Sequence, residues 1–390
     1  MERPIPGSAA VIELFDAGDL PEALAQRWPM EAAYIRQFAQ TPSQDLIRNV
    51  TTTVRALSIG DALMPVTVDS PHPGNCYVVS PSAAYTEYAR YELQILPQPL
   101  VKQILKGVIA AFEYWYRRVR FDRIVHVNNW MLSTNMYHCW EGEGLEEITA
   151  ALLDRYPDKA IVFRSLNPFS NGKLLETMTR SGYVLLPSRQ VYIQDARQDQ
   201  GRRFSAHRDF KRDARLVAQR GYRVCSPDPD RNPGVFERLE NLYGQLYLEK
   251  YTPLNPQFTS RWLQNGFQDG WLKLFCLTSA EGRIDGVAGV VRRGDTMTTP
   301  VLGYEMALPQ SLGLYRMLSW ISTDEAIRNG LAFNGSAGAA SFKRSRGAVP
   351  YIEYSAVYGK HLDFERKLAW HVLQSLLNRF AAPLMRRYAL

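Results

Sequence analysis

The sequence predicts a mixed α/β (α+β) protein of two domains, each with a mixed, mostly antiparallel sheet flanked by helices. At 390 residues the chain is longer than a single hydrophobic core usually organises. Apolar residues alternate in some segments and recur every three or four positions in others, which indicates strands and amphipathic helices. The order strands, loop and helix, strand, helix, strand occurs twice. Between the two runs lies QDARQDQGRR, a polar stretch without apolar periodicity that predicts a linker.

The first half begins with a helical segment, residues 1–44, in which DLPEALAQRW and MEAAYIRQFAQ have helical patterns. The first domain is expected over residues 45–196. Its predicted elements are, in order, the strand pair TTTVRALSIGDALMPVTVD, the extended segment CYVVSPSAAYTEYARYEL, a helix over 100–118, the strand RIVHVNNWML, a loop and helix, the strand AIVFRSL, a further helix and the strand SRQVYIQ.

The second domain is expected over residues 204–361. Its predicted elements are a basic helix, a short strand, a helix, the meander WLKLFCLTSAEG, RIDGVAGVVRRG and TMTTPVLGYEM, a loop and helix, the strand LAFNG, a short helix and the strand YIEYSAVYG. Residues 362–390 form a C-terminal helix. Its apolar positions can pack within the chain or between two copies, so a homodimer stays open.

The charge balance is basic, +7 with a pI near 9.1, and it is uneven. Residues 202–223 hold eight Lys/Arg against two Asp. Such a cluster can attract coenzyme phosphates, RNA or a membrane surface, but a basic cluster taken alone is more often an ordinary solvated helix face. The four cysteines form no CxxC pair, which fits reduced thiols and a cytoplasmic protein. No signal peptide and no apolar run of about 18 residues is present, so we expect no integral membrane association.

A candidate ligand site lies where the meander ends. A strand ends near Glu305, a short loop follows, and a helix is expected to begin at Leu314. A helix N-terminus leaves backbone N–H groups unpaired and favours negative charge. Gly313 lets a ligand approach the backbone closely, so this turn is a plausible pyrophosphate site. Many such turns bind nothing.

Here the chain resembles a known family. Gln310-x-x-Gly313-x-Tyr315 is similar to the Q/R-x-x-G-x-G/A donor loop of GNAT-fold acyltransferases, with Tyr315 in place of a small residue. The segment that follows, through FNGSAGAASFKRSRGA, resembles the C-terminal domain of the Fem-like and CelD-like acyltransferases, and HRDFKRDARLVAQRGYRV resembles the basic helix that opens it. The resemblance spans about residues 205–359 and is fainter over 46–195.

The resemblance implies two tandem GNAT-like domains. In the first, the segment 141–144 (EGEG) stands where the donor loop belongs, and its glutamates would repel a phosphate, so that donor site is degenerate. The second domain is then the catalytic one. The resemblance also implies that no cofactor is tightly bound and that acyl-CoA or aminoacyl-tRNA is the co-substrate.

Acyl transfer to an amine requires alignment of the reactants, a proton acceptor and oxyanion stabilisation. Glu305 is the candidate base, with Tyr304 beside it, and Tyr358 is a candidate acid. The segment FNGSAGAASFKRSRGA is not a P-loop, but its cations suit phosphates or a 3′ nucleotide end. The donor-binding candidates are Gln310, Gly313, Leu314, Tyr315, Lys343 and Arg344.

The acceptor is expected to meet YLEKYTPLNPQF and the polar run HVNNWMLSTNMYHCW. The first can equally be a rigid lid, and the second can pair with backbone. His126, His138 and Cys139 have no carboxylate at ligand spacing, so no metal site is expected. The acceptor-binding candidates are Tyr247, Lys250, Tyr251, Asn255 and Asn128.

The sequence thus favours an N-acyltransferase that moves an acyl group from a thioester, on CoA or a carrier protein, to the amine of a small metabolite. An aminoacyl-tRNA-dependent transferase of the Fem-like type, with tRNA as a partner, stays open. A non-catalytic GNAT-fold binding protein is a third alternative, and an enzyme acting on lipid headgroups at a membrane surface is a weaker one.

Overall fold

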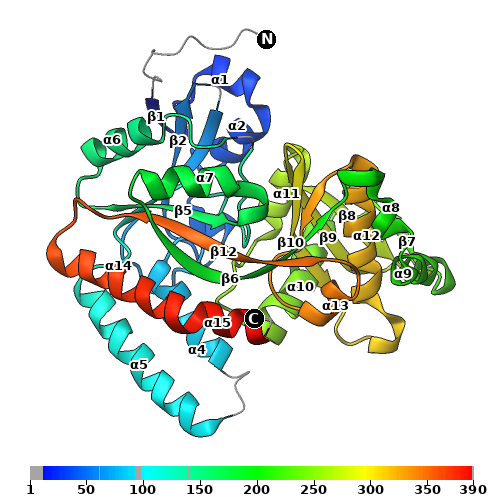
Figure 1. Cartoon of the computed structure of the whole chain (residues 1–390). Coiled ribbons are helices and arrows are strands. Elements are labelled where there is room, and N and C mark those ends of the chain that lie inside the picture. Colours follow the sequence, from blue (N-terminus) through cyan, green and yellow to red (C-terminus); the bar gives the residue numbers. More distant parts are fainter. Residues whose placement is uncertain (1–11, 61, 94–97, 139, 389–390) are drawn as a thin grey trace.

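The computed structural model describes residues 12–60, 62–93, 98–138 and 140–388 (Figure 1). The strands in these ranges form one twelve-stranded mixed sheet, in the order β1-β2-β3-β4-β5-β12-β6-β11-β10-β9-β8-β7. The strands are β1 (Ile12–Asp16), β2 (Thr53–Ile59), β3 (Ala62–Asp69), β4 (Ile124–Val127), β5 (Ala160–Leu166), β6 (Val184–Asp195), β7 (Arg223–Cys225), β8 (Lys273–Thr278), β9 (Ile284–Arg293), β10 (Thr296–Tyr304), β11 (Ala332–Asn334) and β12 (Val349–Tyr358).

Helices cover both halves of this sheet. They are α1 (Glu22–Arg27), α2 (Pro29–Arg36), α3 (Ser43–Leu46), η1 (Ala83–Tyr88), α4 (Ala89–Glu92), α5 (Pro99–Arg118), α6 (Leu145–Arg155), α7 (Pro168–Arg180), η3 (Gln198–Gly201), α8 (Arg202–Ser205), α9 (Arg208–Gln219), α10 (Val235–Tyr243), η4 (Gly244–Tyr251), α11 (Ser260–Gln268), η5 (Gln310–Leu312), α12 (Leu314–Asn329), α13 (Ala340–Arg344), α14 (Phe364–Leu376), η6 (Leu377–Ala381) and α15 (Ala382–Tyr388). The predicted mixed α/β class is confirmed.

The two halves share strands at the centre of the sheet. Strand β12, which comes late in the chain, lies between β5 and β6 and is antiparallel to both. Strand β6, from the first half, extends far enough to pair with β11 of the second half. The sheet is therefore continuous, whereas the sequence predicts a separate sheet in each domain. The division into domains at residues 196 and 204 remains a prediction.

Two predicted segments have a different structure. The N-terminal segment, expected to be helical, contains β1, whose residues pair antiparallel with β2. The segment expected to be extended after Cys76 instead forms η1 and α4. Its helical start is stabilised by Ser80, whose Oγ accepts a hydrogen bond from the N–H of Ala83 at 3.1 Å.

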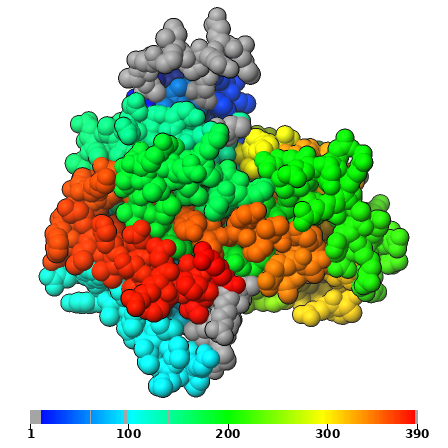
Figure 2. All heavy atoms as spheres, in the orientation of Figure 1, coloured from blue at the N-terminus to red at the C-terminus, as the bar shows by residue number. Residues whose placement is uncertain are grey.

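The core joins the two halves. The ring of Tyr34 lies 4.5 Å from that of Trp130 and 5.2 Å from that of Trp271. The C-terminal helices pack on the first half through Trp370 and Leu373. Figure 2 shows this C-terminal segment, coloured red, covering one face beside the cyan projection of α5. Among the residues that the structure describes, no helix has the length and apolarity to cross a bilayer.

Candidate functional site

The predicted donor site lies where β10 and β11 part. These parallel strands pair over only three positions, from Thr296 with Ala332 to Thr298 with Asn334. Beyond that point β10 continues to Tyr304, while β11 gives way to a loop of small residues. Ligands commonly bind at the carboxyl ends of parallel strands that part in this way.

The predicted donor loop has the expected backbone. Helix α12 begins at Leu314, and Gly313 precedes it with φ of 76°, a conformation that favours glycine. The first bond of the helix runs from the Met317 N–H to the Gly313 carbonyl, so the preceding N–H groups have no helical partner. Leu216 of α9 lies over Gly313, since a Cβ there would come within 2.6 Å of Leu216 Cδ2. Gln310 is exposed on the short turn η5.

Tyr315 lies at the third position of the loop and packs against its neighbours. Its ring centroid is 4.9 Å from that of Phe342 and 6.5 Å from that of Tyr304. Burial raises the pKa of Tyr315 well above its ordinary value, so the phenol stays protonated. The structure therefore brings Tyr304 and Tyr315 together. The Tyr315 ring occupies the position where the family's loop has a small residue.

Lys343 organises the loop after β11. Its Nζ donates to the carbonyls of Gly335 at 2.6 Å, Ser336 at 3.2 Å and Ala337 at 2.7 Å. Burial, with a smaller contribution from Arg189, lowers the pKa of Lys343 to about 7 although carbonyls accept from it. Arg344, the next residue, is exposed. The structure therefore gives Lys343 a loop-holding contact and leaves Arg344 accessible to an anion.

Glu305 lies at the end of β10 but is engaged within the protein. Its carboxylate accepts hydrogen bonds from Arg238 Nη2 at 3.0 Å and from the Ala307 N–H at 3.1 Å. Burial acts to raise the pKa of Glu305, but these bonds and one from Gln245 outweigh it and leave the pKa lowered. A carboxylate held in this way is a weak base, so the geometry does not favour Glu305 as proton acceptor.

Tyr358 lies away from the other predicted catalytic residues. It is the last residue of β12, pairs with Ile161 of β5, and its ring lies 5.3 Å from that of Tyr183. Because β12 runs into the first half of the sheet, this tyrosine joins the core there. The expectation that Tyr358 shares a site with Glu305 is corrected by this strand order.

The predicted acceptor residues divide into two groups. Tyr247 stacks on Tyr243 at 5.0 Å, and Asn255 Nδ2 donates to the Tyr247 carbonyl at 2.9 Å, so Asn255 fixes the turn. Lys250 and Tyr251 are exposed, with Lys250 Nζ 5.9 Å from the Tyr251 ring centre.

Asn128 differs from the rest of the predicted acceptor set. Its Nδ2 donates to the Met136 carbonyl at 2.9 Å and its Oδ1 accepts from Trp130 Nε1 at 3.1 Å. It is fully buried, with φ of 54°. Both ends of the amide are therefore used inside the fold, and the acceptor role is replaced by a structural one. Cys139, considered above for metal binding, lies outside the described residues.

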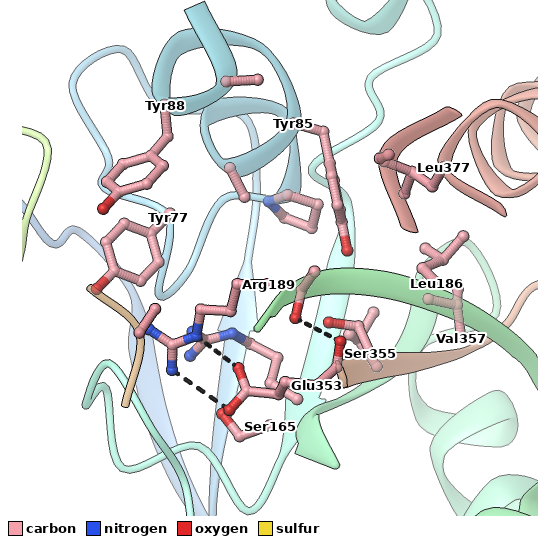
Figure 3. A pocket seen from close by; sticks show the side chains of 18 of the residues that line it. Tyr77, Tyr85, Tyr88, Ser165, Leu186, Arg189, Glu353, Ser355, Val357 and Leu377 are labelled. Atoms are coloured by element: carbon pink, nitrogen blue, oxygen red, sulfur yellow. Dashed lines mark hydrogen bonds and ion pairs between the residues drawn. The ribbon is translucent and has the colours of Figure 1, made fainter. Parts of the chain in front are cut away.

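Sequence reasoning missed a cavity of about 210 Å³ at the centre of the sheet (Figure 3). One end is polar and holds Arg164, Ser165, Arg189 and Glu353. The other end is apolar and includes Leu186, Val357 and Leu377, which Figure 3 shows on the side away from the Arg189–Glu353 pair. Tyr77, Tyr85 and Tyr88 also line it.

The polar residues of this cavity come from β5, β6 and β12, which are far apart in the sequence. No local motif joins them, because β12 reaches its place only through the exchange of strands. One signal was present: Arg164 is a charged residue inside AIVFRSL, a strand that is otherwise almost wholly apolar. A charge in a buried strand requires a partner or a ligand.

Comparison with known proteins finds a family match within the second half of the chain. Residues 205–344 match the family model described as acetyltransferase (GNAT) domain. No curated protein matches the chain. Solved structures with a similar arrangement include FemX, at 10% identity, covering 60% of this chain and 79% of that one with a TM-score of 0.44. L-PGS from Bacillus licheniformis has 17% identity, covers 59% and 77%, and has a TM-score of 0.40.

A third solved structure is from Enterococcus faecalis V583, a conserved protein of unknown function described as a probable N-acyltransferase. It has 11% identity and a TM-score of 0.32, and covers 90% of this chain and 73% of that one. The family match spans β10, Gly313, α12 and Lys343, which are the elements built up above. Residues 205–344 therefore resemble a GNAT acetyltransferase domain, and this likeness covers only that part of the chain.

Proposed function

We propose that the chain transfers an acyl group from an acyl thioester to the amine of a small molecule. The observation that carries the proposal is the GNAT match over residues 205–344, which contains a glycine-preceded helix N-terminus beside the gap between β10 and β11. The donor's phosphates would lie against the N–H groups at the start of α12, where the helix dipole favours negative charge.

The reaction then needs no covalent intermediate. The uncharged amine nitrogen attacks the thioester carbonyl, a C–N bond forms and the C–S bond breaks. The nitrogen loses one proton, and the departing thiolate takes up one proton, so the products are an amide and a free thiol. Since Arg238 holds the Glu305 carboxylate, we assign Glu305 to positioning the end of β10 rather than to proton transfer. The acceptor amine would then have to reach the carbonyl in its uncharged form.

The test is titration calorimetry with acetyl-CoA on the wild type and on Arg344→Gln. Arg344 is exposed, so its replacement should leave folding unchanged and weaken donor binding several-fold. Arg231→Gln is the matched control, because Arg231 is an exposed arginine on a loop outside the donor site. Equal weakening in both variants would indicate only a general charge effect, and no acetyl-CoA binding to the wild type would contradict the proposal.

A second candidate is transfer from aminoacyl-tRNA. It is favoured by the outer face of α9, where Arg208, Lys211, Arg212 and Arg215 together line one open hollow. Four cations on one exposed face suit a phosphate backbone. This candidate predicts that bulk aminoacylated tRNA binds with a steep salt dependence, and that replacing these four residues by glutamine abolishes binding.

A further inference from the structure

We propose that the central cavity binds an amphipathic anion, with its carboxylate or phosphate head at Arg164 and Ser165 and its apolar body towards Leu377. No residue of this cavity belongs to the predicted donor or acceptor sets. The inference deepens the proposed function by naming the chemistry of a substrate, and it rests on that function only in calling the ligand a substrate. Binding itself is measured without turnover.

A β-bulge places Arg164 and Ser165 in the same cavity. Tyr354 of β12 pairs with Leu166 and Ala356 pairs with Phe163, so β5 has one residue more than β12 over this stretch. Consecutive residues on a regular strand face opposite ways. Here Ser165 adopts φ of 65°, which is unusual for a residue with a side chain, and both residues line the cavity.

A second bulge lies on the other side of β12. Glu353 pairs with Arg189, and the next residue, Tyr354, pairs with Pro187, which leaves Ser188 as the extra residue of β6. Ser188 and Arg189 consequently also line the cavity together. The two bulges lie on either side of Tyr354, and each lets two consecutive polar residues line the same cavity. Unusual backbone conformations of this kind are concentrated at functional sites.

The charges at this end are not balanced. Arg189 pairs with Glu353, with Nε 2.8 Å from Oε1 (Figure 3). Arg164 is 8% exposed and donates two long hydrogen bonds of 3.3 Å, to the Val78 carbonyl and to Asn129 Oδ1. Its guanidinium also lies 5.8 Å from the centre of the Tyr77 ring. Within the described part of the chain no carboxylate forms an ion pair with Arg164. The Glu353 carboxylate acts on both guanidinium groups, so one positive charge is in excess at this end. Buried excess charge is costly, and an anionic ligand would compensate it.

Ser165 gives an independent indication of a ligand. The side chain is 2% exposed, and its Oγ has no hydrogen-bond partner among the described residues although it borders the cavity. Buried hydroxyl groups are nearly always hydrogen-bonded, so an unpaired one beside a cavity indicates a missing acceptor. A carboxylate or phosphate oxygen could accept from Ser165 and from Arg164 together.

The rest of the cavity suits an apolar body. Leu186 of β6, Val357 of β12 and Leu377 of η6 face it, with Trp370 and Met385 from the C-terminal helices. Residues of η1 and α4 line the cavity together with these helices. A ligand with a charged head and an aliphatic or aromatic body matches both ends, whereas a purely polar metabolite would leave the apolar end unfilled.

The experiment is titration calorimetry of the full chain with octanoate, octyl phosphate and 1-octanol. Octanoate or octyl phosphate should bind at least tenfold more tightly than 1-octanol, which has the same body and no charge. Binding of octyl phosphate alone would identify the head group as a phosphate, and binding of octanoate alone would identify it as a carboxylate. Equal affinity for 1-octanol, or no binding of any probe, would overturn the proposal.

Two variants separate recognition from folding. Ser165→Ala should weaken binding of the anionic probe roughly tenfold, the usual effect of losing a hydrogen bond to a charged group, and should leave the unfolding midpoint unchanged. Arg164→Gln should abolish the preference over 1-octanol. Thr299→Val is the control, because Thr299 Oγ1 is likewise buried and has no partner within the described ranges, but lies on β10, outside the cavity.

Unchanged affinity in Ser165→Ala would also overturn the proposal. The failures of the two proposals are distinguishable. If the anionic probes bind but the protein transfers no acyl group from thioesters, the proposed function is wrong and the anion site in the cavity stands. If the protein transfers acyl groups but binds none of the anionic probes, the proposed function stands and the anion site in the cavity is wrong.

Discussion

Arg189 and Glu353 lie opposite each other on β6 and β12 and form an ion pair that joins the first half of the chain to a strand from its second half. The Glu353 side chain is 4% exposed, and Arg189 also donates to Thr134 Oγ1 at 2.8 Å. Removal of one partner of a buried pair leaves the other charge uncompensated.

Glu353→Gln should therefore lower the free energy of unfolding by about 3 kcal/mol. The double variant Arg189→Met with Glu353→Met should recover part of this loss, because no charge remains unpaired. Urea denaturation of the three variants and the wild type measures both effects. A loss below about 1 kcal/mol in Glu353→Gln would show that the pair does not hold the shared strands together.

Glu305→Gln tests whether this carboxylate is the catalytic base. Loss of a general base typically reduces the rate 10²–10⁴-fold. Since Arg238 and the Ala307 N–H bind the carboxylate and lower its pKa, we expect a loss of less than about tenfold, and a pH–rate profile that still follows the acceptor amine. A loss of a hundredfold or more, with the alkaline limb removed, would restore Glu305 as the base.

Asp213 connects α9 to both parts of the proposed donor site. This buried carboxylate accepts from Arg316 Nε of α12 at 2.7 Å and from Arg346 Nη2 after α13 at 2.8 Å. Asp213→Asn should lower the free energy of unfolding by about 3 kcal/mol and raise the KM for the donor more than it changes kcat. Asp209→Asn on the same helix is the control, and an equal effect there would contradict this role.

Lys343 should make folding stability depend on pH. Its pKa is lowered from 10.5 to about 7 in the folded protein, so between these values the unfolded chain binds more protons. The stability of the wild type should therefore rise between pH 7 and pH 10.5, and this contribution should be constant below that range. Lys343→Met should lose this rise. If the free energy of unfolding depends on pH in the same way in the wild type and in Lys343→Met, a group other than Lys343 causes the rise.

Local patterns predict the local elements of this protein well. The meander β8–β10, the start of α12 at Leu314 and the short helix containing Lys343 all follow from apolar periodicity and from Gly313. The exchange of β6 and β12 could not be predicted, because the strand β12 is equally apolar whether it completes its own half or the other one. Its placement depends on long-range pairing, which no local pattern encodes.

The same limit applies to the site. Gly313 and the cations after β11 were visible as neighbours in the sequence. By contrast, Ser165 and Glu353 lie on strands far apart in the sequence, and they line one cavity only because β12 lies between β5 and β6. The bulges beside them come from one extra residue in β5 and one in β6, which no local pattern indicates. The roles expected for Asn128 and Tyr358 failed for a related reason, since their partners Met136 and Tyr183 cannot be inferred from spacing.

The most direct test of the account is thermal unfolding of the full chain with acetyl-CoA and with bulk aminoacylated tRNA in parallel. A ligand at about 100 times its dissociation constant adds about 2.7 kcal/mol to the free energy of unfolding, which gives a measurable shift. We predict stabilisation by acetyl-CoA and a reduced shift in Arg344→Gln. Stabilisation by charged tRNA alone, with no response to acetyl-CoA, would contradict a thioester donor.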